Sequence, residues 1–248
     1  MSIFQFKQFT IAQDQCAMKI NTDSVLLAAW ASPIPEPQYI LDIGTGTGVL
    51  ALMMAQRFPN AQIIGIEIEE NTAKQAAENA AQSPFSHRVK ILHISLQDFA
   101  ALSEYQNQFD CIICNPPYFN VKSHLLAHEN NYARQIARAT LTLTFDVLLT
   151  LSKSLLTKNS NAFFVLPATA DQEFQNSIKM ADFHIHTLCK VQPNPNKNAN
   201  RFLYHLHTQT QTMQETALCI QQLTQTQNKH LSYTAEYATL LKDFLLIF

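Results

Sequence analysis

The feature that most constrains this chain is a run of three closely spaced glycines between an apolar segment and a helical one. The chain of 248 residues has only four glycines, and Gly44, Gly46 and Gly48 lie within five consecutive positions. Residues 40–43 predict a buried strand, and residues 49–56 predict a helix. Glycine is favoured where φ must be positive or where a ligand approaches the backbone. A strand, a glycine loop and a helix N-terminus together predict a nucleotide site at the carboxyl edge of a parallel sheet.

The spacing of these glycines excludes two common phosphate-binding loops. Val49 takes the place of the third glycine of the dinucleotide fingerprint, and no Lys-Ser/Thr pair follows, as a P-loop requires. A second apolar segment, 63–67, ends in an acid that can accept hydrogen bonds from both ribose hydroxyls of an adenosine. This arrangement is similar to the S-adenosylmethionine site of class I methyltransferases. Redox enzymes carry variants of the loop, and a tight turn without a ligand is a further alternative. The expected cofactor contacts are Asp42, Gly44, Thr45, Gly46, Gly48, Glu67 and Ile68.

The composition is that of a globular protein with a substantial core, because 47% of the residues are hydrophobic. No apolar run is long enough to span a bilayer, and the first residues lack the basic and apolar segments of a secretory signal. The five cysteines are an odd number without disulfide-type spacing, which favours a reducing cytosol. We therefore expect a cytoplasmic protein. The net charge of −2 gives no overall attraction to nucleic acid.

Two cysteines, Cys111 and Cys114, form a Cys-x-x-Cys pattern inside the apolar segment 109–115. Residues three apart on a strand point to opposite faces, so a shared metal ion or a disulfide is disfavoured. The pattern predicts two buried cysteines on a strand.

Periodicity predicts an alternation of strands and helices after a short N-terminal arm. Aromatic residues alternate with polar ones at 4–9 and indicate a short strand or a hairpin arm. A helix capped at Thr22-Asp23 follows through Trp30. This order predicts an α/β fold with a doubly wound, mainly parallel sheet. We expect an arm and helix at 1–38 and one compact unit at 39–248. The expected strands lie near 39–42, 62–67, 89–94, 109–115 and 161–166, the helices near 48–57, 71–82, 170–180 and 233–248, and a hairpin at 184–191 and 202–208; 209–230 is left unassigned.

The second motif is Asn115-Pro116-Pro117-Tyr118, directly after the strand at 109–115. An exocyclic amine on a base, or a carboxamide nitrogen, is a poor nucleophile because its lone pair is delocalised. The Asn115 side-chain oxygen and the Pro116 carbonyl can accept both N–H groups, which favours a pyramidal nitrogen. The prolines fix φ and donate no N–H, and Tyr118 offers a ring for a flipped base.

We therefore predict that these four residues catalyse transfer to a planar nitrogen, mainly by positioning. Asn115 is also expected beside the cofactor. A proline-rich exit from a strand is the alternative. The contact with the adenine of the cofactor has two candidate residues. An acid often follows the third strand in this superfamily, yet Ser95 occupies that position and Asp98 lies three residues later. Either Asp98 through a shifted loop, or Ser95 with a backbone N–H, could contact the adenine.

Four histidines lie in the expected hairpin, where His184 and His186, and likewise His205 and His207, are expected to share a face. Histidines on a sheet face near a basic patch are commonly surface residues, so we predict no metal site. No Asp or Glu occurs between Phe183 and Gln214, and such a basic stretch could meet a phosphate backbone or simply be a solvated hairpin.

Several stretches resemble a bacterial family, the tRNA1(Val) (adenine(37)-N6)-methyltransferases. The leader from Phe6 to Trp30 is the family-specific part. Ser95 departs from the usual acid, and the segment 209–230 is the least similar. The resemblance implies a seven-stranded class I methyltransferase sheet with a C-terminal antiparallel hairpin, S-adenosylmethionine as cofactor, and methylation of N6 of adenine 37 beside the anticodon. It continues at 41–48, 78–84, 115–119, 132–134 and 233–237.

The resemblance also implies a cytoplasmic enzyme, expected to be a monomer without metal or membrane contact, that acts on folded tRNA. Anticodon loops have unstacked bases that a pocket can accept. The nearly neutral charge implies a small RNA footprint. Its candidate residues are Lys7, Lys19, Lys122, Arg134, Arg138, Lys197 and Arg201.

Other acceptors and classes stay open. A protein glutamine amide fits the same two acceptor groups, although the 38 residues before the core are few for the helical domain that such enzymes carry. Amines of DNA adenine or rRNA guanine fit as well. A nicotinamide-dependent oxidoreductase is disfavoured by the glycine spacing. A non-catalytic RNA-binding module of this fold is disfavoured by Asn115.

Overall fold

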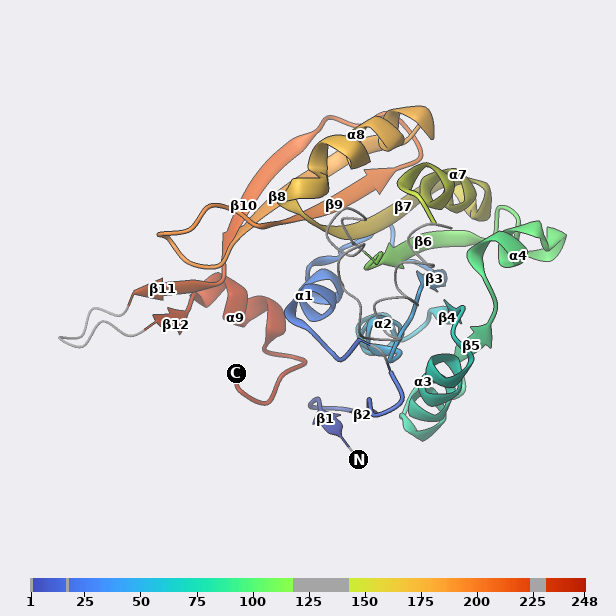
Figure 1. The fold of residues 1–248 in the computed structure, drawn as a ribbon, viewed down its shortest axis with the longest axis horizontal. Helices are drawn as coiled ribbons and strands as arrows, with labels where there is room; N and C mark the ends of the chain where they lie inside the picture. Colours follow the sequence, from blue (N-terminus) through green and yellow to red (C-terminus); the bar gives the residue numbers. More distant parts are fainter. Residues whose placement is uncertain (1, 17, 118–142, 224–230) are drawn as a thin grey trace, which may run out of the picture.

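The fold is centred on one large twisted sheet, which lies between two groups of helices in Figure 1. The computed structural model describes residues 2–16, 18–117, 143–223 and 231–248. Within these residues the sheet has eight strands in the order β10-β8-β9-β7-β6-β3-β4-β5. Their bounds are β3 Tyr39–Ile43, β4 Gln62–Glu67, β5 Val89–His93, β6 Phe109–Cys114, β7 Leu156–Pro167, β8 His184–Gln192, β9 Arg201–His207 and β10 Gln214–Cys219.

The strand directions confirm the predicted mainly parallel sheet. β3 lies between β4 and β6 and is parallel to both, and β5 and β7 continue the parallel pairing on either side. β9 is antiparallel to β7 and to β8, which is the predicted hairpin. β10 pairs in parallel with β8 and adds one strand to the seven that we expected. It lies in the segment that the sequence left unassigned, where Gln and Thr give no apolar alternation.

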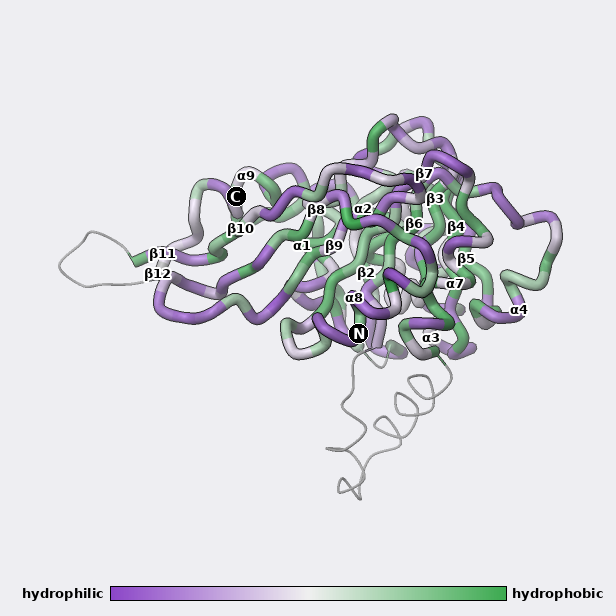
Figure 2. The backbone as a smooth tube through the Cα atoms, turned by 90° about the horizontal axis from the view of Figure 1, so that it is seen from above, coloured by the Kyte–Doolittle hydropathy of each residue, from purple (hydrophilic) through white to green (hydrophobic). Residues whose placement is uncertain are grey.

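Helices cover both faces of the sheet and enclose two cores (Figure 1). The first face carries α1 Thr22–Trp30, α2 Val49–Arg57, α3 Glu70–Gln82 and α9 Ala235–Leu241, and the second carries α4 Leu96–Ala101, α7 Phe145–Leu155 and α8 Asp171–Met180, with short 3₁₀ turns at Ser103–Tyr105 and Ala168–Ala170. Hydrophobic segments run through the interior and hydrophilic ones form the outer loops (Figure 2). Cys111 belongs to the first core and Cys114 to the second, which confirms two buried cysteines on opposite faces of β6.

The N-terminal arm is a hairpin, which was one of the two predicted forms, and it packs on the first core. β1 Ile3–Gln5 and β2 Thr10–Ala12 are antiparallel, and the buried rings of Phe6 and Phe9 stack with centroids 4.5 Å apart. The N-cap of α1 lies one residue before the predicted cap at Thr22-Asp23. Asn21 is the N-cap, because its backbone is extended and its Oδ1 accepts the N–H of Ser24 at 3.0 Å.

Three elements differ from the prediction. α4 and α7 were not predicted, because α4 has only six residues and α7 follows a long segment without a strong periodic pattern. The C-terminal helix is confined to Ala235–Leu241, and it follows a small antiparallel pair of β11 Gln221–Leu223 with β12 Leu231–Tyr233. In the described part of the chain, no helix combines the length and the apolar character that crossing a membrane needs.

Candidate functional site

A cavity of about 230 Å³ opens at the carboxyl ends of β3, β4 and β6. The register pairs Ile43 with both Ile66 and Cys114, so the segments that follow these three strands lie side by side. The two motifs found in the sequence therefore meet, as predicted for a parallel sheet. The lining residues come from the arm (Met18, Lys19, Ile20, Asn21, Ser24), the glycine loop and α2 (Ile43, Gly44, Thr45, Gly46, Thr47, Val49, Leu50), the β4 end and α3 (Ile66, Glu67, Ile68, Glu69, Thr72), and the β5 and β6 ends and beyond (Ile94, Leu96, Gln97, Asn115, Pro117, Leu143).

The glycine loop has the backbone that only glycine adopts readily. Gly44, Gly46 and Gly48 have φ values of +68°, +55° and +85°. The fourth glycine, Gly65 of β4, is required for another reason. A Cβ there would lie 2.9 Å from the Thr45 hydroxyl and 2.7 Å from Ile91 Cδ1. The absence of a side chain at residue 65 thus lets the loop settle against β4.

Asp42 lies behind the loop and does not line the cavity. Its Oδ2 accepts hydrogen bonds from the Thr45 hydroxyl at 2.5 Å and from the Ala51 N–H at 3.0 Å, which ties the loop to the first turn of α2. Its Oδ1 has no hydrogen-bond partner in the described residues. Burial raises the pKa of Asp42 to about 7. These contacts favour a role in holding the loop over the predicted direct contact with a cofactor.

Glu67 ends β4 and faces the cavity, as expected. Its carboxylate accepts backbone N–H groups from Gly46 at 3.1 Å, Ile68 at 2.9 Å and Glu69 at 3.0 Å. Burial raises the pKa of Glu67, and these three hydrogen bonds oppose that rise. Ile68 is 54% exposed and presents an apolar surface at the same end of the cavity. The pair combines an acceptor for hydroxyls with an exposed apolar side chain, which suits a nucleoside.

Asn115 follows β6 and reaches the cavity together with Pro117. The Asn115 side-chain nitrogen donates a hydrogen bond of 2.8 Å to the hydroxyl of Ser24 in the first turn of α1. Pro116 lies between the two lining residues and is buried. Tyr118, the last residue of the predicted motif, lies outside the described residues. The sequence did not single out Ser24, because a serine in an apolar helix gives no sign of a partner 91 residues away.

Ser95 and Asp98 are engaged with each other instead of the cavity. The Ser95 hydroxyl accepts the Asp98 N–H at 3.0 Å and donates to Asp98 Oδ2 at 2.6 Å, so the two residues cap α4. Neither of them lines the cavity, whereas Ile94, Leu96 and Gln97 do. The spacing Ser-x-x-Asp was thus a helix-capping signal, and Gln97 is the polar residue of this turn at the cavity.

The arm forms one wall of the cavity and is held there by two buried amides of α3. Asn79 accepts the Ala12 N–H and donates to the Ala12 and Thr47 carbonyls, each at 2.9 Å. Gln75 accepts the Gln15 N–H at 2.9 Å. Asn79 therefore joins the arm, α3 and the glycine loop. The sequence analysis missed both amides, since polar residues on a helix are usually exposed.

The basic residues predicted to contact RNA do not form one cluster in the described part of the chain. Lys19 lines the cavity, and Lys197 is exposed in the turn between β8 and β9. β8 runs parallel to β7, so this turn lies at the same edge of the sheet as the cavity. Arg201 donates to Asp23 of α1 at 2.7 Å, and Lys7 donates to the Lys242 carbonyl and, at 2.8 Å, to the Phe248 carbonyl. Lys122, Arg134 and Arg138 lie outside the described residues.

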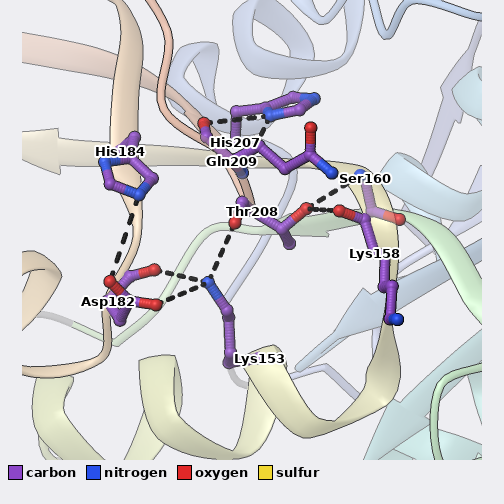
Figure 3. A network of polar contacts seen from close by, with 8 residues as sticks. All are labelled: Lys153, Lys158, Ser160, Asp182, His184, His207, Thr208 and Gln209. Atoms are coloured by element: carbon purple, nitrogen blue, oxygen red, sulfur yellow. Dashed lines mark hydrogen bonds and ion pairs between the residues drawn. The ribbon is translucent and has the colours of Figure 1, made fainter.

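Two of the four histidines, His184 and His207, belong to the polar contacts shown in Figure 3, near the start of β8 and the end of β9 and thus at the edge away from the cavity. A register shift between Ile185 and Thr187 interrupts the alternation that was expected to place His184 and His186 on one face. Burial, with His186 and His207 nearby, lowers the pKa of His205 to about 3. The described residues contain no group of three or more side chains that could hold a metal ion.

The chain is similar to known methyltransferases. The family described as "Methyltransferase domain" matches residues 37–239. The tRNA1(Val) (adenine(37)-N6)-methyltransferase of Vibrio campbellii is 40% identical over 243 residues, covering 98% of this chain and 95% of the relative. The chain belongs to this methyltransferase family. The enzyme of the same name from Pseudoalteromonas translucida is 39% identical over 246 residues, covering 99% of both chains.

The family assignment confirms the resemblance found in the sequence, and a solved structure confirms the fold. A predicted O-methyltransferase from Agrobacterium tumefaciens has a TM-score of 0.68 with 17% sequence identity, covering 90% of this chain and 96% of that chain. At this identity the likeness concerns the fold alone. The doubly wound sheet with a closing antiparallel hairpin is therefore the class I methyltransferase architecture.

Proposed function

We propose that this methyltransferase transfers a methyl group from S-adenosylmethionine to the exocyclic N6 amine of an adenine in tRNA, namely adenine 37 beside the anticodon of tRNA1(Val). The observation that carries the proposal is the meeting of Asn115 and the glycine loop in one cavity. The family assignment supports the choice of acceptor, because the relatives carry that activity in their names.

The residues of the cavity fit S-adenosylmethionine. Gly44 has open space around the position of a Cβ, so its backbone is accessible to a ligand. We assign Glu67 to the ribose hydroxyls, Ile68 to one face of the adenine, and the backbone of residues 44–46 to the remainder of the cofactor. Gly48 ends the loop as the N-cap of α2. The hydrogen bond from Thr45 to Asp42 keeps the loop in place. When bound, the cofactor supplies a methyl group on a positively charged sulfur.

Asn115 and Pro116 would activate the acceptor amine. The amide oxygen of Asn115 and the carbonyl of Pro116 accept its two N–H groups, which draws the nitrogen towards a pyramidal shape and frees its lone pair. The two prolines add no competing N–H and hold φ fixed. Tyr118 would stack on the flipped base. No strong base is required, since the proton can leave after the methyl group has moved, and positioning supplies most of the rate.

Binding of the tRNA would depend on a few basic residues. A small footprint of Lys19, Lys197 and the basic residues outside the described part would hold the tRNA, in keeping with the net charge of −2. We propose that the arm of residues 1–38 and the unit of residues 39–248 act together as a cytoplasmic monomer without a metal ion. The burial of Phe6 and Ile11 in the same core as α2 supports this joint action.

The deciding experiment measures transfer of labelled methyl from S-adenosylmethionine to bulk tRNA, bulk rRNA, DNA and a release-factor protein. We expect label only in tRNA, as N6-methyladenosine, and its loss with Asn115→Ala. The matched control is Asn71→Ala, which removes an exposed amide of α3. Label in rRNA, DNA or protein would move the acceptor to one of the alternatives. Label in none of them, with the cofactor bound, would favour a non-catalytic RNA-binding module.

A further inference from the structure

Ser24 is a buried hydroxyl in contact with the catalytic motif. It is 9% exposed, lies in the first turn of α1 and lines the cavity. Its Oγ accepts a hydrogen bond of 2.8 Å from Nδ2 of Asn115. The contact joins the N-terminal arm to the end of β6, which are far apart in the sequence.

An asparagine side chain fits almost the same space in two orientations, which exchange its oxygen and its nitrogen. The two orientations differ in chemistry. With the oxygen turned to the acceptor amine, Asn115 accepts an N–H from it. With the nitrogen turned that way, two donors oppose each other and the amine is not activated. The amide can activate the amine only if the side chain is held within reach of it. A serine hydroxyl can donate or accept, so it can hold the amide at that place.

We propose that Ser24 is a positioning residue that anchors the Asn115 side chain at the place where it meets the acceptor amine. The proposal rests on the function proposed above, in which Oδ1 of Asn115 receives the amine. The bond of 2.8 Å from Nδ2 to Ser24 fixes the place of the amide relative to α1, and in this arrangement Oδ1 is turned away from Ser24. Ser24 itself touches neither reacting atom in this role.

The first turn of α1 is a firm support for that hydroxyl. The Ser24 N–H donates to the N-cap Asn21 at 3.0 Å, and the preceding residue, Asp23, accepts from Arg201 of β9 at 2.7 Å. The next five residues of the helix, Val25 to Ala29, are all buried. The backbone at residue 24 is thus fixed by the cap and by the helix around it, so little further freedom is lost when the Ser24 hydroxyl binds Asn115, which is what precise positioning requires.

The test compares methyl transfer to tRNA by Ser24→Ala, Ser24→Thr and Ser152→Ala with the unchanged enzyme. Ser152→Ala is the matched control. Its hydroxyl is fully buried on α7 and has no hydrogen-bond partner within the described residues, and it lies away from the cavity. Each variant is assayed for kcat at saturating tRNA and cofactor, for the Kd of S-adenosylmethionine, and for the midpoint of thermal unfolding.

We expect Ser24→Ala to lower kcat about 3- to 10-fold, the effect of one hydrogen bond of about 1 kcal/mol. The Kd of the cofactor should change less than about two-fold, because Ser24 acts on Asn115 and not on the cofactor. A general distortion of the cavity would instead raise this Kd together with the loss in kcat. Ser24→Thr keeps a hydroxyl and should retain most of the activity. Ser152→Ala should match the unchanged enzyme in kcat.

Three results would overturn the role of Ser24: a kcat of Ser24→Ala within two-fold of the unchanged enzyme, a loss of the same size in Ser152→Ala, or a loss in kcat fully explained by weaker cofactor binding. Failure of the proposed function has a different signature. In that case the unchanged enzyme makes no N6-methyladenosine in tRNA, and the comparison is repeated with the amine acceptor that does take label.

Discussion

Replacement of Asn79 by alanine should detach the arm from the cofactor cavity. The Asn79 side chain is 3% exposed and makes three hydrogen bonds of 2.9 Å, to the N–H and carbonyl of Ala12 and to the carbonyl of Thr47. Each buried hydrogen bond contributes about 1 kcal/mol. Asn79→Ala should therefore lower the free energy of unfolding by about 3 kcal/mol. For a chain of this size that corresponds to a fall in Tm of roughly 6–12 °C.

The assay combines thermal unfolding with calorimetric titration of S-adenosylmethionine. Since the arm and the glycine loop both lose a tie to α3, the Kd of the cofactor should rise together with the loss of stability. The control is Asn71→Ala on the same helix, an exposed position where the expected change is below about 0.5 kcal/mol. The reasoning is refuted if Asn79→Ala unfolds at the same temperature as Asn71→Ala, or if it binds the cofactor as tightly.

Three further predictions concern the loop, the pH dependence and the RNA. Gly48→Ala should cost about 1–2 kcal/mol in the free energy of unfolding, measured in urea, because φ at residue 48 is +85°. Burial raises the pKa of Asp42 from 3.8 to about 7, so the folded chain retains a proton that the unfolded chain has released. This group therefore makes unfolding easier as the pH rises from about 4 to 7, and Asp42→Asn should lose less stability than the unchanged enzyme between pH 4 and pH 7 in urea titrations. Lys197→Ala should reduce the salt dependence of tRNA binding by about one counterion, whereas Lys158→Ala, at the opposite edge of the sheet, should leave it unchanged; equal slopes for the two variants would remove the β8–β9 turn from the interface.

The backbone of the site was predictable because its signals are local. Glycines are rare in this chain, so three of them between an apolar strand and a helix indicate positive φ, and all three have it. The prolines after Asn115 likewise mark the end of a strand. Parallel pairing then requires both motifs to meet at one edge, as they do on β3 and β6.

The partners of polar side chains were not predictable in the same way. Asp42 and Asp98 have the chemistry of ligand contacts, yet one supports the loop and the other caps α4. Lys7 has the charge for RNA and instead bonds to carbonyls near the other end of the chain. Ser24 and Asn79 gave no signal, because their hydrogen bonds reach 91 and 67 residues along the chain. Such roles depend on tertiary contacts, which residue type alone does not reveal.

The pairing of Ile43 with Cys114 has a consequence for how this enzyme tolerates insertions and deletions. One residue added or removed within β3 would displace the glycine loop by about 3.3 Å along the sheet, and the same change within β6 would displace Asn115. In either case the residue after the altered strand would turn to the opposite face. The methyl donor and its acceptor would then no longer meet. A change of length in the connection at 102–108, which joins α4 to β6, leaves that pairing intact. Variation in length should therefore accumulate between these strands, while each strand keeps a fixed number of residues.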